Sequence, residues 1–117
     1  MFPHSTTEDR IYLGEKPLEY TVYSAESIIA KAVGLMGRPG IPKNTALLFD
    51  MGRPSQQPVH MLGVREPIRV WWVTNNRIKR TEQLKPWSGF AMDRGDTIIE
   101  LPADAPPGSI GQRVSIE

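Results

Sequence analysis

Residues 68–84, Ile-Arg-Val-Trp-Trp-Val-Thr-Asn-Asn-Arg-Ile-Lys-Arg-Thr-Glu-Gln-Leu, are the stretch that most directly predicts the fold. Aromatic and β-branched residues dominate residues 68–73, which is typical of a strand, and a second strand is expected at 78–84. Asn75 and Asn76 stand between them and are frequent turn formers. The stretch therefore predicts two short strands separated by a turn.

Further short strands are expected on both sides of this stretch, and one helix precedes them. Ser24 is a candidate helix cap, and a stripe of apolar residues at three-to-four spacing follows it as far as Gly37, a natural helix terminator. The pattern indicates an α+β, mostly β fold: a small antiparallel barrel or curled sheet of about six to eight short strands, with one main helix. The helix is expected at 25–36, and the other strands at 10–13, 18–23, 45–49, 59–62, 97–101 and 113–116.

The composition describes a single globular domain. The 117 residues are 39% hydrophobic and 23% charged, with a formal net charge of +1. A chain of this length fits one core, and we expect a polar N-terminal tail at 1–16 followed by one β-rich domain at 17–117. Because the chain has no cysteine, disulfides, thiolate nucleophiles and sulfur-ligated metals are excluded.

No segment of the sequence has the length and apolar character of a membrane span. Residues 1–10 also lack the apolar centre of a secretion signal. The chain as given is therefore expected to be cytoplasmic. An exported protein whose leader had been trimmed would have the same sequence, so that alternative stays open.

Charge is unevenly distributed along the chain. Six basic side chains and two acidic ones fall within 65–85, whereas five acidic side chains and two basic ones fall within 93–117. We favour an interpretation in which these segments are neighbouring strands whose outer faces pair. The alternative is single-stranded nucleic acid binding along 65–85, which the near-neutral total charge disfavours.

A set of six short motifs carries a resemblance to a known family. The motifs occur in the same order as in the bacterial and archaeal family called domain of unknown function 192, which the chain resembles over approximately 18–116. The resemblance implies a compact β-rich α+β domain, often exported in relatives, with no established reaction or cofactor. The motifs are Gly34–Arg38, Leu47–Phe49, His60-Met61, Pro67-Ile68, Leu84–Trp87 and Ile99–Ala103.

Three positions depart from the pattern of that family. Arg69 stands where the family has an aspartate after the proline, Asp104 replaces a glycine, and Gln112 replaces a common carboxylate. Exchanging an acid for a cation at Arg69 reverses the local electrostatic preference, toward anions. The departures indicate a divergent member, whose function need not match that of its relatives.

His60 is the one histidine inside the predicted domain. It is a possible general base or ligand, but a strand residue bonded to a backbone carbonyl is the preferred interpretation because no nucleophile is evident. No catalytic residue is assigned. One histidine without cysteine gives too few ligands for a metal, so neither a metal nor a cofactor is expected.

Alternation along 68–73 places Ile68 in the core and Arg69 with Trp71 on the opposite face. An exposed arginine beside an exposed indole could bind a planar anion or a base, although the preferred alternative pairs Arg69 with Glu82 or Glu100 while Trp71 packs under the tail. Residues 51–58 are expected to form a loop with recognition groups. The aromatic cluster of Trp71, Trp72, Trp87 and Phe90 is expected to be mostly core.

These observations lead to one leading hypothesis and two alternatives. The leading hypothesis is a non-enzymatic β-barrel module that binds a small ligand or partner protein in a basic and aromatic groove. The alternatives are a small hydrolase or isomerase that uses His60 with Asp50 or Ser55, and the nucleic-acid binder above. The candidate binding residues of the leading hypothesis are Arg53, Gln56, His60, Arg65, Arg69 and Trp71.

Overall fold

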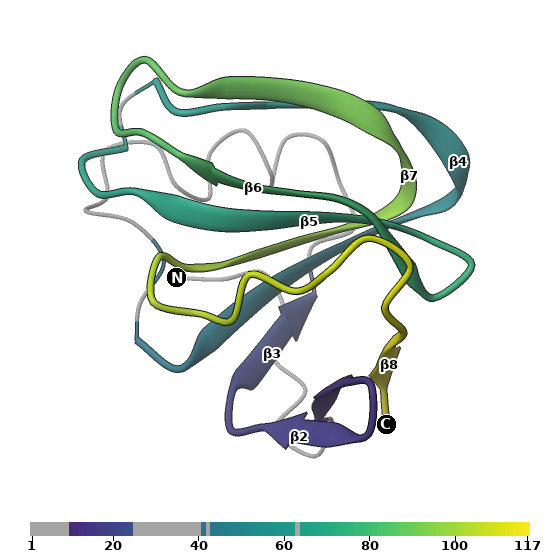
Figure 1. The fold of residues 1–117 in the computed structure, drawn as a ribbon. Helices are drawn as coiled ribbons and strands as arrows, with labels where there is room; N and C mark the ends of the chain where they lie inside the picture. The colour runs from purple at the N-terminus through teal and green to yellow at the C-terminus, as the bar shows by residue number, and fades with distance from the viewer. Residues whose placement is uncertain (1–9, 25–40, 42, 63) are drawn as a thin grey trace.

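The computed structural model describes residues 10–24, 41, 43–62 and 64–117. Within these residues the chain forms two sheets (Figure 1): a five-stranded sheet in the order β3-β4-β7-β5-β6, and a three-stranded sheet in the order β2-β1-β8. The strands are β1 (Ile11–Leu13), β2 (Lys16–Leu18), β3 (Thr21–Ser24), β4 (Thr45–His60), β5 (Ile68–Thr74), β6 (Arg77–Leu84), β7 (Phe90–Pro102) and β8 (Val114–Ile116).

The mostly β fold is confirmed, and of the two expected arrangements the closed barrel is not formed in the described part of the chain. The sheets of the described residues do not close into a barrel, and β3 pairs with β4 in parallel whereas the other ladders are antiparallel. The helix expected at 25–36 lies outside the described residues. Residues 10–13, where a short strand was expected, contain β1, whose Ile11 is fully buried.

The most local prediction is confirmed in detail. β5 and β6 form an antiparallel pair joined at Asn75 and Asn76. Both asparagines have positive φ, 51° and 62°, which matches the two-residue hairpin turn whose twist suits antiparallel strands. The turn is held further by the backbone N–H of Asn75, which donates to the Asp96 carboxylate at 3.0 Å.

The loop expected at 51–58 is instead part of β4. The ladder between β4 and β7 shifts register between Asp50 and Ser55, then resumes and continues to the pair His60–Phe90. Pro54 and Pro58 lie in this part of the strand, although proline removes a backbone donor. Pairing with β7 holds this part of the chain extended despite these prolines. We call the paired segments 55–60 and 90–95 the distal ribbon.

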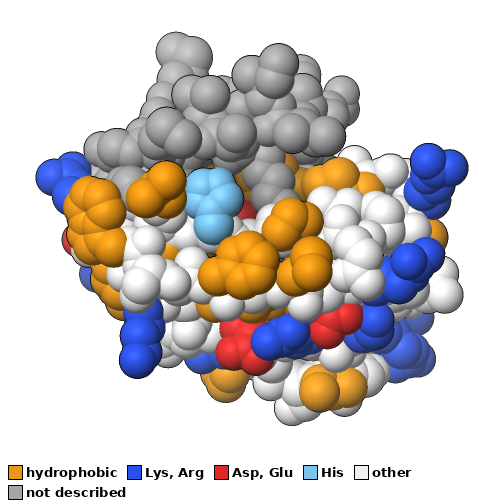
Figure 2. Space-filling view, turned by 90° about the horizontal axis from the view of Figure 1, so that it is seen from above, with side chains coloured by type: hydrophobic (Ala, Val, Ile, Leu, Met, Phe, Trp, Pro, Cys, Tyr) orange, Lys and Arg blue, Asp and Glu red, His pale blue; other side chains and the backbone are white. Residues whose placement is uncertain are grey.

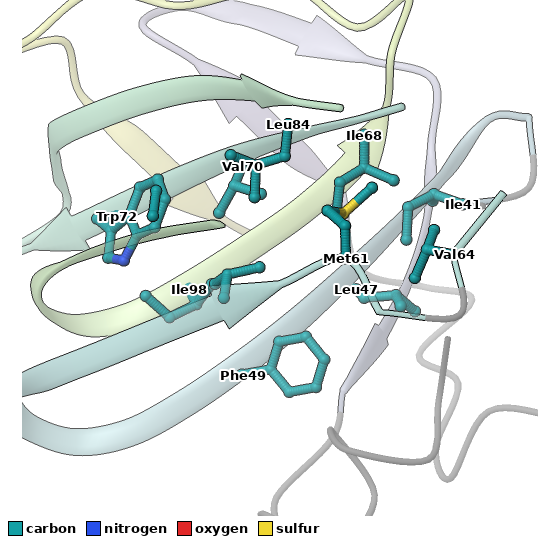
Figure 3. Packing of buried hydrophobic residues seen from close by; sticks show 12 residues of the cluster. Ile41, Leu47, Phe49, Met61, Val64, Ile68, Val70, Trp72, Leu84 and Ile98 are labelled. Carbon is teal, nitrogen blue, oxygen red and sulfur yellow. The ribbon is translucent and has the colours of Figure 1, made fainter. Parts of the chain in front are cut away.

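The distal ribbon curls back over β5, and the first core lies between them (Figure 3). Val59 and Ala91 of the ribbon pack in the same apolar cluster as Val70 and Trp72 of β5. The indole N–H of Trp72 donates to the Gln57 carbonyl at 2.9 Å, which ties the two layers together. The other members of the cluster are Ile41, Leu47, Phe49, Met61, Val64, Ile68, Leu84 and Ile98.

A second core lies on the other face of the five-stranded sheet. It joins Trp71 and Leu101 of that sheet to Ile11 and Val114 of the small sheet. The chain after β7 closes this core, since Ala105 packs into it and the indole N–H of Trp71 donates to the Pro107 carbonyl at 3.0 Å. The sheet is therefore buried on both faces. No helix among the described residues is long and apolar enough to cross a membrane.

Candidate binding surface

The outer face of the distal ribbon carries a set of exposed side chains. Because side chains alternate along a strand, residues adjacent to inward-facing Val59 and Ala91 point away from the first core. The register pairs Pro58 with Met92 and His60 with Phe90, so the four share the outer face. With Gln56 and Arg94, which pair at the next outward position, they form what we call the ribbon face: Gln56, Pro58, His60, Phe90, Met92 and Arg94.

Large apolar groups on and beside this face are unusually exposed. Phe90 and Met92 are 61% and 48% exposed, and the flanking Leu62 and Trp87 are 65% and 58% exposed. Figure 2 shows hydrophobic side chains gathered around the histidine on this side of the molecule. Scattered apolar residues are normal on a surface, but a gathered group of large ones is typical of an interaction site.

Trp87 is held at the border of this surface by a tight turn. Its φ is 65°, and the Ser88 N–H donates to the Pro86 carbonyl at 2.7 Å, which makes Trp87 the centre of a γ-turn with positive φ. Such turns are rare and strained, and bulky residues seldom adopt them. The backbone therefore stores strain where it presents an indole to solvent, a combination that favours a functional role over a packing role.

Gly89 allows this turn to sit against the end of β4. A Cβ at residue 89 would lie 2.5 Å from the Lys85 carbonyl oxygen and 2.8 Å from the Met61 side chain. The Gly89 N–H donates to Lys85 O at 3.0 Å, and its carbonyl accepts from the Met61 N–H at 2.9 Å. Close packing at Gly89 thus fixes Trp87 next to the ribbon face.

The structure separates the six residues proposed as one groove. His60 and Gln56 lie on the ribbon face, Arg53 is exposed at the irregularity where the ribbon begins, and Arg65 is exposed between β4 and β5. Arg69 is on β5, on the side opposite the first core, and it therefore lies across the molecule from His60. Whether any of the six binds a ligand remains a prediction.

Trp71 is fully buried, which excludes the alternative of an exposed indole beside Arg69 and agrees with the preferred expectation that its side chain is packed. The small sheet, whose β1 lies in the segment expected as a tail, and the C-terminal segment cover this face of β5. Conversely, Trp87 and Phe90 were expected to be mostly core and are exposed. For Trp71 the covering contacts come from segments distant in sequence.

The basic segment 65–85 is partly neutralised. Lys79 pairs with Asp93 at 2.9 Å, and Arg80 contacts Glu82 at 3.1 Å and Asp93 at 3.8 Å. The Arg80 guanidinium also lies over the Trp72 ring, 5.5 Å from its centroid. This agrees with pairing between the basic and acidic segments, and it leaves fewer free cations for a nucleic-acid backbone.

The carboxyl group of Asp93 has a perturbed pKa. The hydrogen bond from Lys79, followed by that from the backbone N–H of Arg94, lowers the pKa of Asp93 below its usual value of 3.8. The ionised form is thus the one that these contacts stabilise. Asp93 faces inward along β7, so this charged group borders the ribbon without lying on its outer face.

Ser55, one of the two expected partners of His60 in acid–base catalysis, does not face it. His60 lies five residues from Ser55 along a regular stretch of β4, about 16 Å at the usual strand rise, and strand alternation directs the two side chains to opposite faces. Its Nδ1 accepts from the Leu62 N–H at 3.3 Å. Within the described ranges, no group of three or more His, Cys, Asp or Glu side chains could hold a metal.

Sequence reasoning missed four contributors to this surface: Leu62, Trp87, Phe90 and Met92. The alternation Phe90, Met92, Arg94 was visible, but strand 97–101 was expected to begin later, so no face was assigned to these residues. Extending the strand back to Phe90 would have placed them together. The unusual backbone of Trp87 leaves no recognisable signal in the sequence.

Fold and surface together define a β-rich module with an exposed aromatic face. The chain belongs to the DUF192 family, described as uncharacterised, whose family model matches residues 11–111. No curated protein matches the sequence.

Two solved structures share the fold. A candidate transcription regulator from Sinorhizobium meliloti 1021 is 21% identical with a TM-score of 0.76, over 92% of this chain and 90% of that one. A protein of unknown function from Novosphingobium aromaticivorans DSM 12444 is 14% identical with a TM-score of 0.69, over 92% of this chain and 82% of that one. At these identities the likeness concerns the fold alone.

Proposed function

We propose that this chain is a non-enzymatic binding module that holds a polypeptide segment of a partner protein on the ribbon face. The observation that carries the proposal is the exposed cross-strand pair formed by Phe90 with His60 and continued by Met92 with Pro58. Aromatic residues and methionine are enriched at the centres of protein interfaces, where they supply large apolar contact areas.

The charges of the ribbon face indicate the chemistry of the partner segment. Its six positions include Arg94 and His60 but no carboxylate, and the exposed Arg65 lies in the segment that follows β4. A complementary segment would present apolar side chains to Phe90 and Met92, with acidic residues alongside. Pro54 and Pro58 reduce the backbone donors of β4, which favours side-chain contacts over addition of a strand to its edge.

A peptide-display selection on the purified protein tests the proposal. We expect enrichment of peptides that combine apolar and acidic residues. Phe90→Ser should weaken the selected peptides at least tenfold, because it removes an anchor from the centre of the surface. Ile110→Ser is the matched control, since Ile110 is 75% exposed in the C-terminal segment; it should change the affinity less than twofold.

Three results would overturn the proposal. The first is a selection that enriches no peptide, and the second is an affinity equally sensitive to Ile110→Ser and Phe90→Ser. The third comes from light scattering of the purified protein: a dimer that Phe90→Ser dissociates would show that a second copy covers the ribbon face.

A further inference from the structure

Arg69 is a partly buried cation whose hydrogen bonds all go to neutral groups. Its Nη1 donates to Thr81 Oγ1 at 3.2 Å, and its Nη2 donates to Gln83 Oε1 at 3.4 Å. Both acceptors come from β6, the strand that pairs with β5 beside Arg69. Its Nε is buried without a partner, and it is the only such side-chain atom in the described part of the chain.

The strand register explains why the two carboxylates expected to pair with Arg69 do not reach it. Glu82 and Glu100, the expected partners, both pair with Val70, so they lie on the opposite face of the sheet from Arg69. Glu82 instead contacts Arg80 at 3.1 Å. None of the ion pairs between described residues includes Arg69.

A network of hydrogen bonds fixes the position of the guanidinium. The Thr81 hydroxyl accepts from Arg69 and donates to the Pro107 carbonyl, which also accepts from the Trp71 indole. Thr81 therefore has its proton committed, and Arg69 is held against a rigid part of the second core. A cation fixed in advance loses little conformational entropy when it binds a ligand.

We infer that Arg69 and Gln83 form a site for a small oxyanion, either a carboxylate or a phosphate group. The guanidinium has five N–H donors, and only two serve the neutral acceptors, so each Nη keeps one hydrogen. The exposed Gln83 accepts from Arg69 through Oε1, which leaves its amide nitrogen as a second donor beside Nη2. An anion there would offset the cost of the partly buried charge.

This site is independent of the proposed protein partner. Arg69 and the ribbon face point away from the first core in opposite directions, so a small anion beside Gln83 would not touch Phe90 or Met92. The two proposals can therefore fail separately.

Side-chain NMR of the full chain tests the inference with inorganic phosphate and acetate as separate probes. Each probe is titrated at constant ionic strength with sodium chloride as the balancing salt. We expect a saturable shift of the Arg69 Nε–H resonance with at least one probe. Comparing the two arms shows whether a tetrahedral or a planar anion is preferred.

Three variants complete the experiment. Gln83→Ala removes the exposed donor without disturbing the core and should weaken binding severalfold, and Arg69→Lys should weaken it about tenfold because the two-pronged donor is lost. Lys85→Gln also removes one exposed positive charge and should leave binding unchanged. Shifts that follow ionic strength alone, or equal losses in Gln83→Ala and Lys85→Gln, would overturn the inference.

Discussion

At the scale of single residues, Gly89 and Trp87 show how the candidate surface is built. Gly89 is needed for space, because the nearest atoms to a Cβ at that position belong to the Lys85 backbone. Trp87 has the positive φ that its side chain disfavours, and its indole is nevertheless exposed. The surface therefore depends on the small size of Gly89 and on a backbone conformation at Trp87 that tryptophan disfavours.

Gly89→Ala should lower the free energy of unfolding by about 3 kcal/mol, because backbone atoms cannot move aside as a flexible side chain can. Gly52→Ala is the control: Gly52 has a φ of 80°, but a Cβ added there would meet no atom within 4 Å, so only the conformational cost of about 1 kcal/mol applies. Urea unfolding of both variants measures the difference. Equal losses would show that close packing at Gly89 is unimportant.

Trp87 also provides a spectroscopic probe, because Trp71 and Trp72, the other two tryptophans of the chain, are fully buried. Acrylamide should therefore quench Trp87 fluorescence preferentially, and a bound partner peptide should protect it. Trp87→Phe should remove most of the quenchable signal while leaving the buried emission. Quenching that is unchanged in Trp87→Phe would contradict the exposure of this indole.

At the scale of elements, β6 meets the distal ribbon through side chains rather than a backbone ladder. Arg80 donates to the Met92 carbonyl at 3.0 Å, and Lys79 pairs with Asp93. Charges at an edge strand discourage pairing with other chains, and here they also close the gap to β7. The two oppositely charged segments of the sequence are brought together in this way.

The Asp93 contacts predict a pH dependence of stability. The pKa of Asp93 in the folded protein lies below 3.8, its usual value. The contribution of Asp93 to the free energy of unfolding is therefore fully present above the pKa of the unfolded state, and it is lost as pH falls through the pKa of the folded state. Urea midpoints of the parent chain should therefore fall below about pH 4. Asp93→Asn should reduce the midpoint at neutral pH and flatten this decline, whereas Glu66→Gln, at an exposed position, should do neither. A decline as steep in Asp93→Asn as in the parent would exclude Asp93 as its source.

At the scale of the whole molecule, the sequence predicts local features well and long-range ones poorly. The β5–β6 pair was predictable because strand-forming residues and two turn asparagines lie next to each other in the chain. The burial of Trp71 was preferred, but its hydrogen bond to Pro107, thirty-six positions away, was not foreseen. His60 and Gln56 could be named as candidate binding residues from the sequence. Their position across the molecule from Arg69 could not be predicted, because it depends on contacts between distant segments.

The two adjacent tryptophans join three layers of the molecule. Trp72 points into the first core and bonds to Gln57 of the distal ribbon, whereas Trp71 points into the second core and bonds to Pro107 of the C-terminal segment. Alternation along β5 is what sends the two indoles in opposite directions. Each indole N–H therefore ties a different outer segment to the central sheet.

Replacing each indole separately should loosen a different part of the molecule. Trp72→Phe and Trp71→Phe each remove one hydrogen bond and some buried volume, and each should lower the free energy of unfolding by about 2 kcal/mol or more. Amide hydrogen exchange distinguishes them, because local opening depends on local contacts. Trp72→Phe should speed exchange in the ribbon segments 55–60 and 90–95, and Trp71→Phe in 103–113. Because the ribbon carries Phe90 and Met92, only Trp72→Phe should also weaken peptide binding there; the same exchange pattern in both variants would mean that the two cores open as one unit.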